Sequence, residues 1–239
     1  MAKMTLDDLV AQLKAAYGPA LRAVVLYGSA AAGEHRQGRS DYNVLVVVES
    51  LGMPQLRAVA ATARAWGEAG HPPPLTLTVS EWLSSSDVFP IEYADILERH
   101  RVLYGDLPLE GIAVQPADLR TQVEQQALGK LLQLRGGILA TGGVQKNQVA
   151  LLEQSLSTLM VVFRAVVRLH GGQPPVDYEA LAAQVGADAG FDPAPFVRVV
   201  RHVRGTEKLP PDAAEGILAA YLDALGALVA HIDRYTAGR

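Results

Sequence analysis

Residues that could do chemistry gather between positions 28 and 43 of the chain. Gly28 and Ser29 follow one apolar run, and Asp41 and Asn43 precede another. The tiny residues after Gly28 suit a first helical turn capped by Ser29, whose unpaired backbone N–H groups would face a phosphate. Asp41 offers the carboxylate oxygens that magnesium prefers, and Asn43 offers an amide oxygen. Two residues apart on a strand, these two side chains would share one face.

The flanking runs are the elements that must position these residues. Residues 23–26 and 44–48 are rich in β-branched side chains, which predicts two adjacent strands of a buried sheet around a glycine-opened turn. Residues 5–17 and 54–69 have the apolar periodicity of helices, with Thr5 as the predicted cap of the first. Residues 75–79 read as a third strand. This order of helices and strands predicts an α/β or α+β layer.

The arrangement resembles the signature of the polymerase-β-like nucleotidyltransferases, close to their aminoglycoside-modifying and minimal branch. The resemblance implies that Gly28 and Ser29 hold a nucleoside triphosphate such as ATP, and that Asp41 binds magnesium. In that family a second Asp, two residues after the first, also binds the metal ions, and Asn43 stands at its position here. Asn43 is therefore expected to be a weak metal ligand at most.

A third carboxylate, on a later strand, helps to activate the attacking hydroxyl in that family. The strand predicted at residues 75–79 carries no acid. Glu81 comes shortly afterwards, but we interpret it as the opening of a helix that Ser80 caps. Residues 88–109 add to the resemblance, because a helix and then Arg-Val-Leu-Tyr-Gly commonly follow the nucleotidyltransferase core. We interpret the acids of that helix as a solvated face, and His100 as a surface or packed residue.

The second half of the chain reads almost entirely as helix. Glycine and proline recur through residues 105–116 without helical periodicity, which predicts a domain boundary there. We therefore predict a nucleotidyltransferase-like domain with a small mixed sheet at residues 1–110 and an all-α bundle at residues 117–239. Apolar periodicity and short connections indicate about five antiparallel-packed helices, at residues 117–140, 145–169, 178–184, 194–203 and 212–235.

One pair of basic residues in this half resembles a known site. Arg164 and His170 have a spacing similar to that in the active site of HEPN-type ribonucleases, although Ala165 replaces the polar residue that commonly follows the arginine. We interpret the pair instead as basic residues that compensate the dipole at a helix C-terminus.

Composition sets the outer limits. The chain has 239 residues, of which 49% are hydrophobic and 19% charged, as in a globular protein, and a net charge of -4 gives no reason to expect a nucleic-acid partner. It contains no cysteine, which excludes disulfides and Cys-based metal sites. No signal-peptide pattern and no uncharged run of membrane-spanning length is visible, so the expected location is the cytoplasm, without a membrane partner. The oligomeric state, a homo-oligomer included, stays open.

The sequence thus predicts a nucleotidyltransferase fold with a degenerate metal site. A neutral Asn43 and a missing third acid indicate a nucleotide-binding or scaffold protein, a pseudoenzyme with weak catalysis or none. A second hypothesis is an active transferase that moves a nucleoside monophosphate from an NTP to a small-molecule or protein hydroxyl, with Asp41 as the main magnesium ligand. A third is a partner-binding module of the toxin–antitoxin type.

Overall fold

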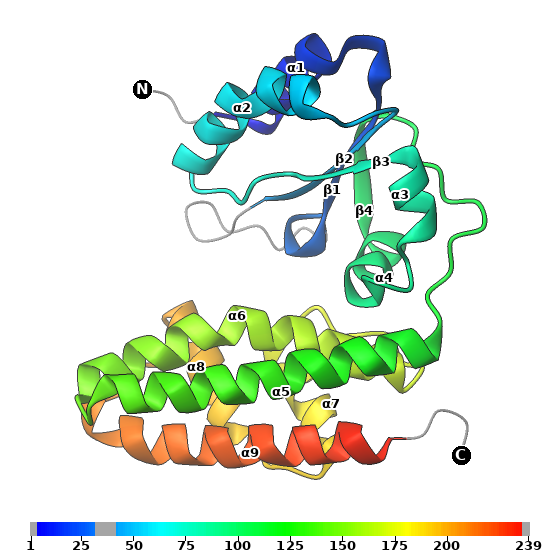
Figure 1. The fold of residues 1–239 in the computed structure, drawn as a ribbon. Helices are drawn as coiled ribbons and strands as arrows, with labels where there is room; N and C mark the ends of the chain where they lie inside the picture. The colour runs from blue at the N-terminus through cyan, green and yellow to red at the C-terminus, as the bar shows by residue number, and fades with distance from the viewer. Residues whose placement is uncertain (1–3, 32–41, 236–239) are drawn as a thin grey trace. The chain divides into compact units, whose positions relative to one another are not determined.

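The computed structural model describes residues 4–31 and 42–235, which form two compact units (Figure 1). We call Met1–Val114 the sheet unit and Gln115–Arg239 the bundle unit. The small mixed sheet of the first and the helices of the second confirm the predicted fold class.

A four-stranded sheet forms the centre of the sheet unit. Its strands are β1 (Leu21–Tyr27), β2 (Asn43–Val48), β3 (Leu75–Thr78) and β4 (His100–Gly105), in the order β3-β2-β1-β4. β1 pairs antiparallel with both β2 and β4, whereas β2 and β3 run parallel. β1 and β2 are the central strands, and their near-continuous apolar sequences fit a position in which both faces are covered.

Helices cover both faces of this sheet (Figure 1). α1 (Leu6–Tyr17) and α2 (Met53–Glu68) pack on one face, and α3 (Val79–Ser84) and α4 (Pro90–Glu98) pack on the other. Alternate residues of a strand point to opposite faces, so each central strand contributes to two cores. The core under α1 and α2 takes Val24, Leu26, Val44, Val46 and Val48, and the core under α3 and α4 takes Ala23, Val25, Leu45 and Val47.

The first helix begins where its capping residues predict. The Oγ1 atom of Thr5 accepts a hydrogen bond from the Asp8 N–H at 3.2 Å, and Asp8 Oδ2 accepts one from the Thr5 N–H at 3.0 Å. These two bonds form a capping box, which satisfies two donors of the open helix end. The Thr5 cap predicted from sequence is confirmed.

The start of α3 differs from the prediction. Thr78, the last residue of β3, is the cap, and its Oγ1 accepts from the Glu81 N–H at 3.2 Å. Glu81 Oε2 accepts from the Thr78 N–H at 2.7 Å. Glu81 does open the helix, but Ser80 lies inside the first turn instead of capping it. Thr78 is the better cap because its backbone, at the end of β3, already has the extended conformation of an N-cap residue.

Strand β4 was not predicted. Its residues pair with β1 at the edge of the sheet, and most of them are partly or fully exposed, so the sequence lacks a clean two-residue alternation. Gly105 ends the strand with φ at +70°, and a Cβ there would overlap the carbonyl oxygen of Arg22 on β1. Only glycine allows the two backbones to approach this closely.

The bundle unit consists of five α-helices within its described residues. They are α5 (Pro116–Thr141), α6 (Gln145–Leu169), α7 (Tyr178–Ala189), α8 (Ala194–Arg204) and α9 (Ala214–Arg234), with a 3₁₀ turn at Pro211–Ala213 before α9. The five predicted helices are confirmed, and α7 runs five residues beyond its predicted end.

Two of these helices are apolar enough to cross a membrane by length and composition. They are Gln145–Leu169 and the segment Pro211–Arg234. Both belong to the core of the bundle, where Phe163 of α6 and Tyr221 of α9 are fully buried. Burial against neighbouring helices accounts for the apolar faces of these two helices.

Candidate nucleotide site

The end of strand β1 and the start of strand β2 bring the glycine turn against Asn43. Tyr27 and Asn43 face each other in register, and Gly28 follows with φ at +74°. A Cβ on Gly28 would lie 3.3 Å from Asn43 Nδ2. Glycine therefore serves twice here, because it adopts the left-handed region and leaves room for the amide. Two of the predicted site residues lie side by side.

The start of the turn differs from the prediction. Gly28–Ala30 forms a single 3₁₀ turn, in which the Ala31 N–H donates to the Gly28 carbonyl at 3.1 Å. The residue at the cap position is Tyr27, with no side-chain cap bond, so the prediction that Ser29 caps the turn is wrong. The strand continues one residue further than expected, and Ser29 then falls inside the turn. Asp41 lies outside the described residues.

His71 anchors the chain directly before Asn43. Its Nδ1 accepts a hydrogen bond from the backbone N–H of Tyr42 at 3.2 Å. The His71 ring lies 4.9 Å from the Tyr42 ring and 4.2 Å from the buried Trp66 ring, measured between centroids. An accepting Nδ1 requires the proton of the neutral ring to be on Nε2. His71 thus fixes the position of Tyr42, the residue between Asp41 and Asn43. This contact could not be predicted from the sequence, because His71 follows α2 and is 29 residues away.

The row of facing residues continues into strand β4. Tyr27 pairs with Asn43 on one side and with His100 on the other. His100 Nδ1 lies 2.7 Å from the Ile96 carbonyl, which can only accept, so Nδ1 carries a proton. His100 is therefore packed against α4, as one of the two predicted alternatives had it. The pairing with Tyr27 places His100 at the same end of the sheet as Asn43. No pattern in the sequence predicted this pairing.

Strand β3 offers no acid to this end of the sheet. Leu75 and Leu77 share the sheet face of Leu45 and hence of Asn43. Glu81, the nearest following acid, is held by the capping box of α3. The hydrogen bond from the Thr78 backbone, followed by the one from its side chain, lowers the pKa of Glu81. A carboxylate bound to two donors in this way is a poor base.

The described residues around the glycine turn provide no cluster of carboxylates for a pair of magnesium ions. Two such ions a few ångströms apart need several carboxylates to offset their charge. Asn43 contributes a neutral amide whose nitrogen lies toward Gly28. Across residues 4–31 and 42–235, no three His, Asp or Glu side chains are grouped closely enough to hold a metal ion.

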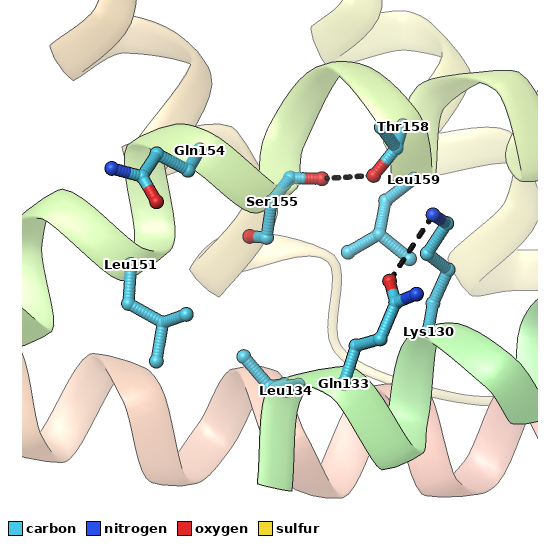
Figure 2. Close-up of a pocket in the computed structure, with 8 residues that line it drawn as sticks. All are labelled: Lys130, Gln133, Leu134, Leu151, Gln154, Ser155, Thr158 and Leu159. Atoms are coloured by element: carbon cyan, nitrogen blue, oxygen red, sulfur yellow. Dashed lines mark hydrogen bonds between the residues drawn. The ribbon is translucent and has the colours of Figure 1, made fainter. Parts of the chain in front are cut away.

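The bundle unit contains a separate pocket of about 210 Å³ between α5 and α6 (Figure 2). Lys130 Nζ donates to Gln133 Oε1 at 3.2 Å across one wall, and Thr158 Oγ1 donates to the Ser155 carbonyl at 3.1 Å on the other. The lining is otherwise apolar or amide. Its lining has one cation, Lys130, and no carboxylate or imidazole.

With its mixed sheet, glycine turn and helical bundle, the chain has the polymerase-β-like nucleotidyltransferase fold. A similar solved structure is that of spectinomycin adenyltransferase AAD(9) from Enterococcus faecialis, determined with ATP and spectinomycin. The TM-score is 0.60, and the match covers 96% of this chain and 98% of that one. Sequence identity is 14%, so the likeness shows the fold alone. No protein-family model and no curated protein sequence matches the chain.

Proposed function

We propose that the sheet unit binds a nucleoside triphosphate at the Gly28–Ser29 turn and transfers its nucleotide slowly or not at all. The observation that carries this proposal is the position of the Asn43 amide, whose Nδ2 lies 3.3 Å from where a Cβ on Gly28 would stand. It places a neutral side chain beside the turn, at the position where the related family has a metal-binding carboxylate. Binding through backbone N–H groups needs no carboxylate, whereas nucleotidyl transfer does.

The fold likeness supports a nucleotide as the ligand. The structure of the adenyltransferase AAD(9) contains ATP, and its fold spans nearly the whole of both chains. Two departures from the family signature concern its acids: Asn43 replaces a metal-binding acid, and β3 lacks the acid that activates the acceptor. Asp41 would then hold one magnesium ion on the triphosphate, with Asn43 as a weak additional ligand. We propose a cytoplasmic location for this activity.

Titration calorimetry with ATP, with and without magnesium, tests the proposal. The wild type should bind ATP with a small magnesium dependence, and Asp41→Ala should abolish that dependence. Asn43→Asp should raise magnesium-dependent affinity on the order of tenfold, or 1.4 kcal/mol, because a carboxylate adds charge. Ser29→Ala should weaken binding by about 0.5–1.5 kcal/mol, one hydrogen bond. Equal affinities for all four proteins, unchanged by magnesium, would leave the fold as a scaffold only.

A matched pair of glycine variants tests the role of the turn. Gly28→Ala places a methyl group against Asn43, whereas Gly18→Ala meets nothing within 4 Å, and both glycines have positive φ. Gly28→Ala should therefore lose ATP affinity while Gly18→Ala keeps it at a similar cost in stability. Equal ATP affinity in both variants would place the nucleotide elsewhere.

The adenyltransferase likeness also favours one specific alternative, an active transferase. Pyrophosphate release from ATP in the presence of small hydroxyl acceptors distinguishes it from the proposed binding function. We expect no release above the rate of Asp41→Ala, because β3 supplies no acid to activate the acceptor. Release that depends on the acceptor and on Asp41 would establish the transferase instead.

A further inference from the structure

Two histidines from different helices face each other at one end of the bundle unit. His170 caps the C-terminus of α6, and His231 lies in the last turn of α9. Their Nε2 atoms are 3.0 Å apart, and the ring centroids are 5.1 Å apart with an angle of 23° between the planes. We call these residues the His pair. The pair is accessible to solvent. Its two members are 61 residues apart in the chain.

Neighbouring contacts hold the His pair in this geometry. The Tyr235 ring packs edge-on against His170 at 4.8 Å, and Tyr235 Oη donates to the Leu169 carbonyl at 2.7 Å. Arg120 of α5 donates from Nε to the Tyr235 carbonyl at 2.8 Å and from Nη2 to the Asp233 carbonyl at 3.0 Å. The ends of α6 and α9 are thus tied together through Tyr235, independently of the two imidazoles.

The helix dipoles favour a cation between the rings. Both histidines stand at helix C-termini, where the negative ends of the helix dipoles lie. The positive charge of Arg234 opposes a positive charge on His231, whereas the negative charge of Asp188 on α7 favours one. Because the two Nε2 atoms lie at hydrogen-bond distance, one of them accepts the bond and has its lone pair directed at the other ring.

We propose that the His pair binds one Zn²⁺ ion through the two Nε2 atoms. Zinc–imidazole bonds of about 2.0–2.1 Å at a tetrahedral angle place two ligand nitrogens roughly 3.3 Å apart. The observed 3.0 Å needs a shift of a few tenths of an ångström, which the exposed His170 ring can make against the half-buried His231 ring. On binding, the ring that donated the N–H···N bond changes tautomer: its proton moves from Nε2 to Nδ1 through solvent. Each neutral ring then carries one proton on Nδ1 and shares its Nε2 lone pair with the ion.

Water completes the coordination of this ion. In the described parts of the chain, no third His, Asp or Glu lies close enough to form a three-residue metal group with the pair. The site is therefore an open, two-residue chelate that joins the C-terminal ends of α6 and α9. Imidazole ligands favour zinc, copper and nickel over magnesium or calcium, which take oxygen ligands. This site is separate from the nucleotide site and does not depend on the proposed function.

Zinc titration of the full chain tests the proposal. We expect one zinc ion to bind to the wild type and raise its Tm, with no such effect from magnesium. His170→Ala and His231→Ala should each weaken zinc binding about tenfold or more, because the second imidazole binds an ion that the first already holds. The matched control is His202→Ala in the same unit, where Nε2 pairs with Glu153 at 2.9 Å and Nδ1 accepts from Leu209. This control should bind zinc as the wild type does.

A second measurement needs no variant. One equivalent of Cu²⁺, used as a probe, should give an electron paramagnetic resonance spectrum with hyperfine splitting from two imidazole nitrogens. Zinc should displace this copper. Splitting from fewer than two nitrogens, or equal zinc affinity in His170→Ala, His231→Ala and His202→Ala, would overturn the proposal and leave the pair as a plain hydrogen bond between histidines.

Discussion

The two units bring their polar groups together by different means. In the sheet unit, strand register aligns Asn43, Tyr27 and His100 in one row at the end of the sheet. In the bundle unit, the packing of α6 on α9 brings His170 to His231. A row set by strand pairing depends on backbone hydrogen bonds, whereas a pair between helices depends on the side chains packed around it. The two units should therefore respond differently to changes in the backbone and in the core.

Truncation of a core side chain should have the largest effect in the bundle unit. Phe163 is fully buried on α6, and its ring meets that of Phe196 edge-on at 5.0 Å. Phe163→Ala should cost about 3–5 kcal/mol of the free energy of unfolding, since it removes buried area and leaves a cavity. Chemical denaturation followed by circular dichroism measures the loss.

The matched control for this change is Leu139→Ala. Leu139 lies on α5 with 83% of its surface exposed, so its truncation should change stability by no more than about 0.5 kcal/mol. An equally small loss for Phe163→Ala would mean that buried side chains do not hold the helices together. It would contradict the expected difference between the two units.

A backbone change at the sheet should have the next largest effect. Gly105→Ala makes a Cβ that overlaps the Arg22 carbonyl oxygen on β1 and also strains a positive φ. Gly111→Ala has the same kind of φ, at +79°, but meets nothing within 4 Å. Gly105→Ala should therefore lose about 1–3 kcal/mol more than Gly111→Ala, which isolates the cost of forcing β4 away from β1.

Thermal unfolding of both variants measures this difference, and amide hydrogen exchange locates it. Exchange should rise along β1 and β4 in Gly105→Ala and stay unchanged there in Gly111→Ala. Equal stability of the two variants would show that the pairing of β4 with β1 tolerates a shift of the backbone.

Elements with strong apolar periodicity were predictable from sequence. The bounds of α6 match the prediction at both ends, and β2 differs from it by one residue. These elements bury one or both faces, so their patterns are clear. Strand β4 was missed because its half-exposed edge position leaves no alternation to read. The cap of α3 was misplaced by two residues, since both Thr78 and Ser80 are capping residue types.

The candidate sites were predictable only where residues are close in sequence. Gly28 directly follows β1 and Asn43 begins the neighbouring β2, and the motif between Arg22 and Glu49 identified both. The bond from Tyr42 to His71 spans 29 residues, and that between His170 and His231 spans 61. Such contacts depend on how whole helices pack, and local sequence patterns carry little information about that packing.

The smallest predicted effect concerns Asp177, the helix cap of the bundle unit. Asp177 Oδ1 accepts from the N–H groups of Glu179 and Ala180 at 2.9 and 3.0 Å, and its Oδ2 pairs with Arg204 Nη1 at 2.6 Å. Asp177→Ala should cost about 0.5–2 kcal/mol at pH 7, the range for losing a cap. Thr5→Ala, which removes the corresponding cap of α1 in the sheet unit, should cost a similar amount.

The pH dependence separates the charge of Asp177 from its capping bonds. The hydrogen bond from Ala180 is the largest cause that lowers the pKa of Asp177, and the bond from Arg204 adds to it against the effect of burial. Because the folded-state pKa lies below the unfolded one, this stabilisation is complete above the usual 3.8 and is lost as the pH falls through the folded value. The cost of Asp177→Ala should therefore shrink below about pH 4, whereas Asp177→Asn, which keeps a capping oxygen but no charge, should lose less at pH 7. Urea denaturation of the three proteins at pH 7 and pH 3 measures both effects. A cost of Asp177→Ala that stays constant between these pH values would show that the neutral cap alone stabilises α7.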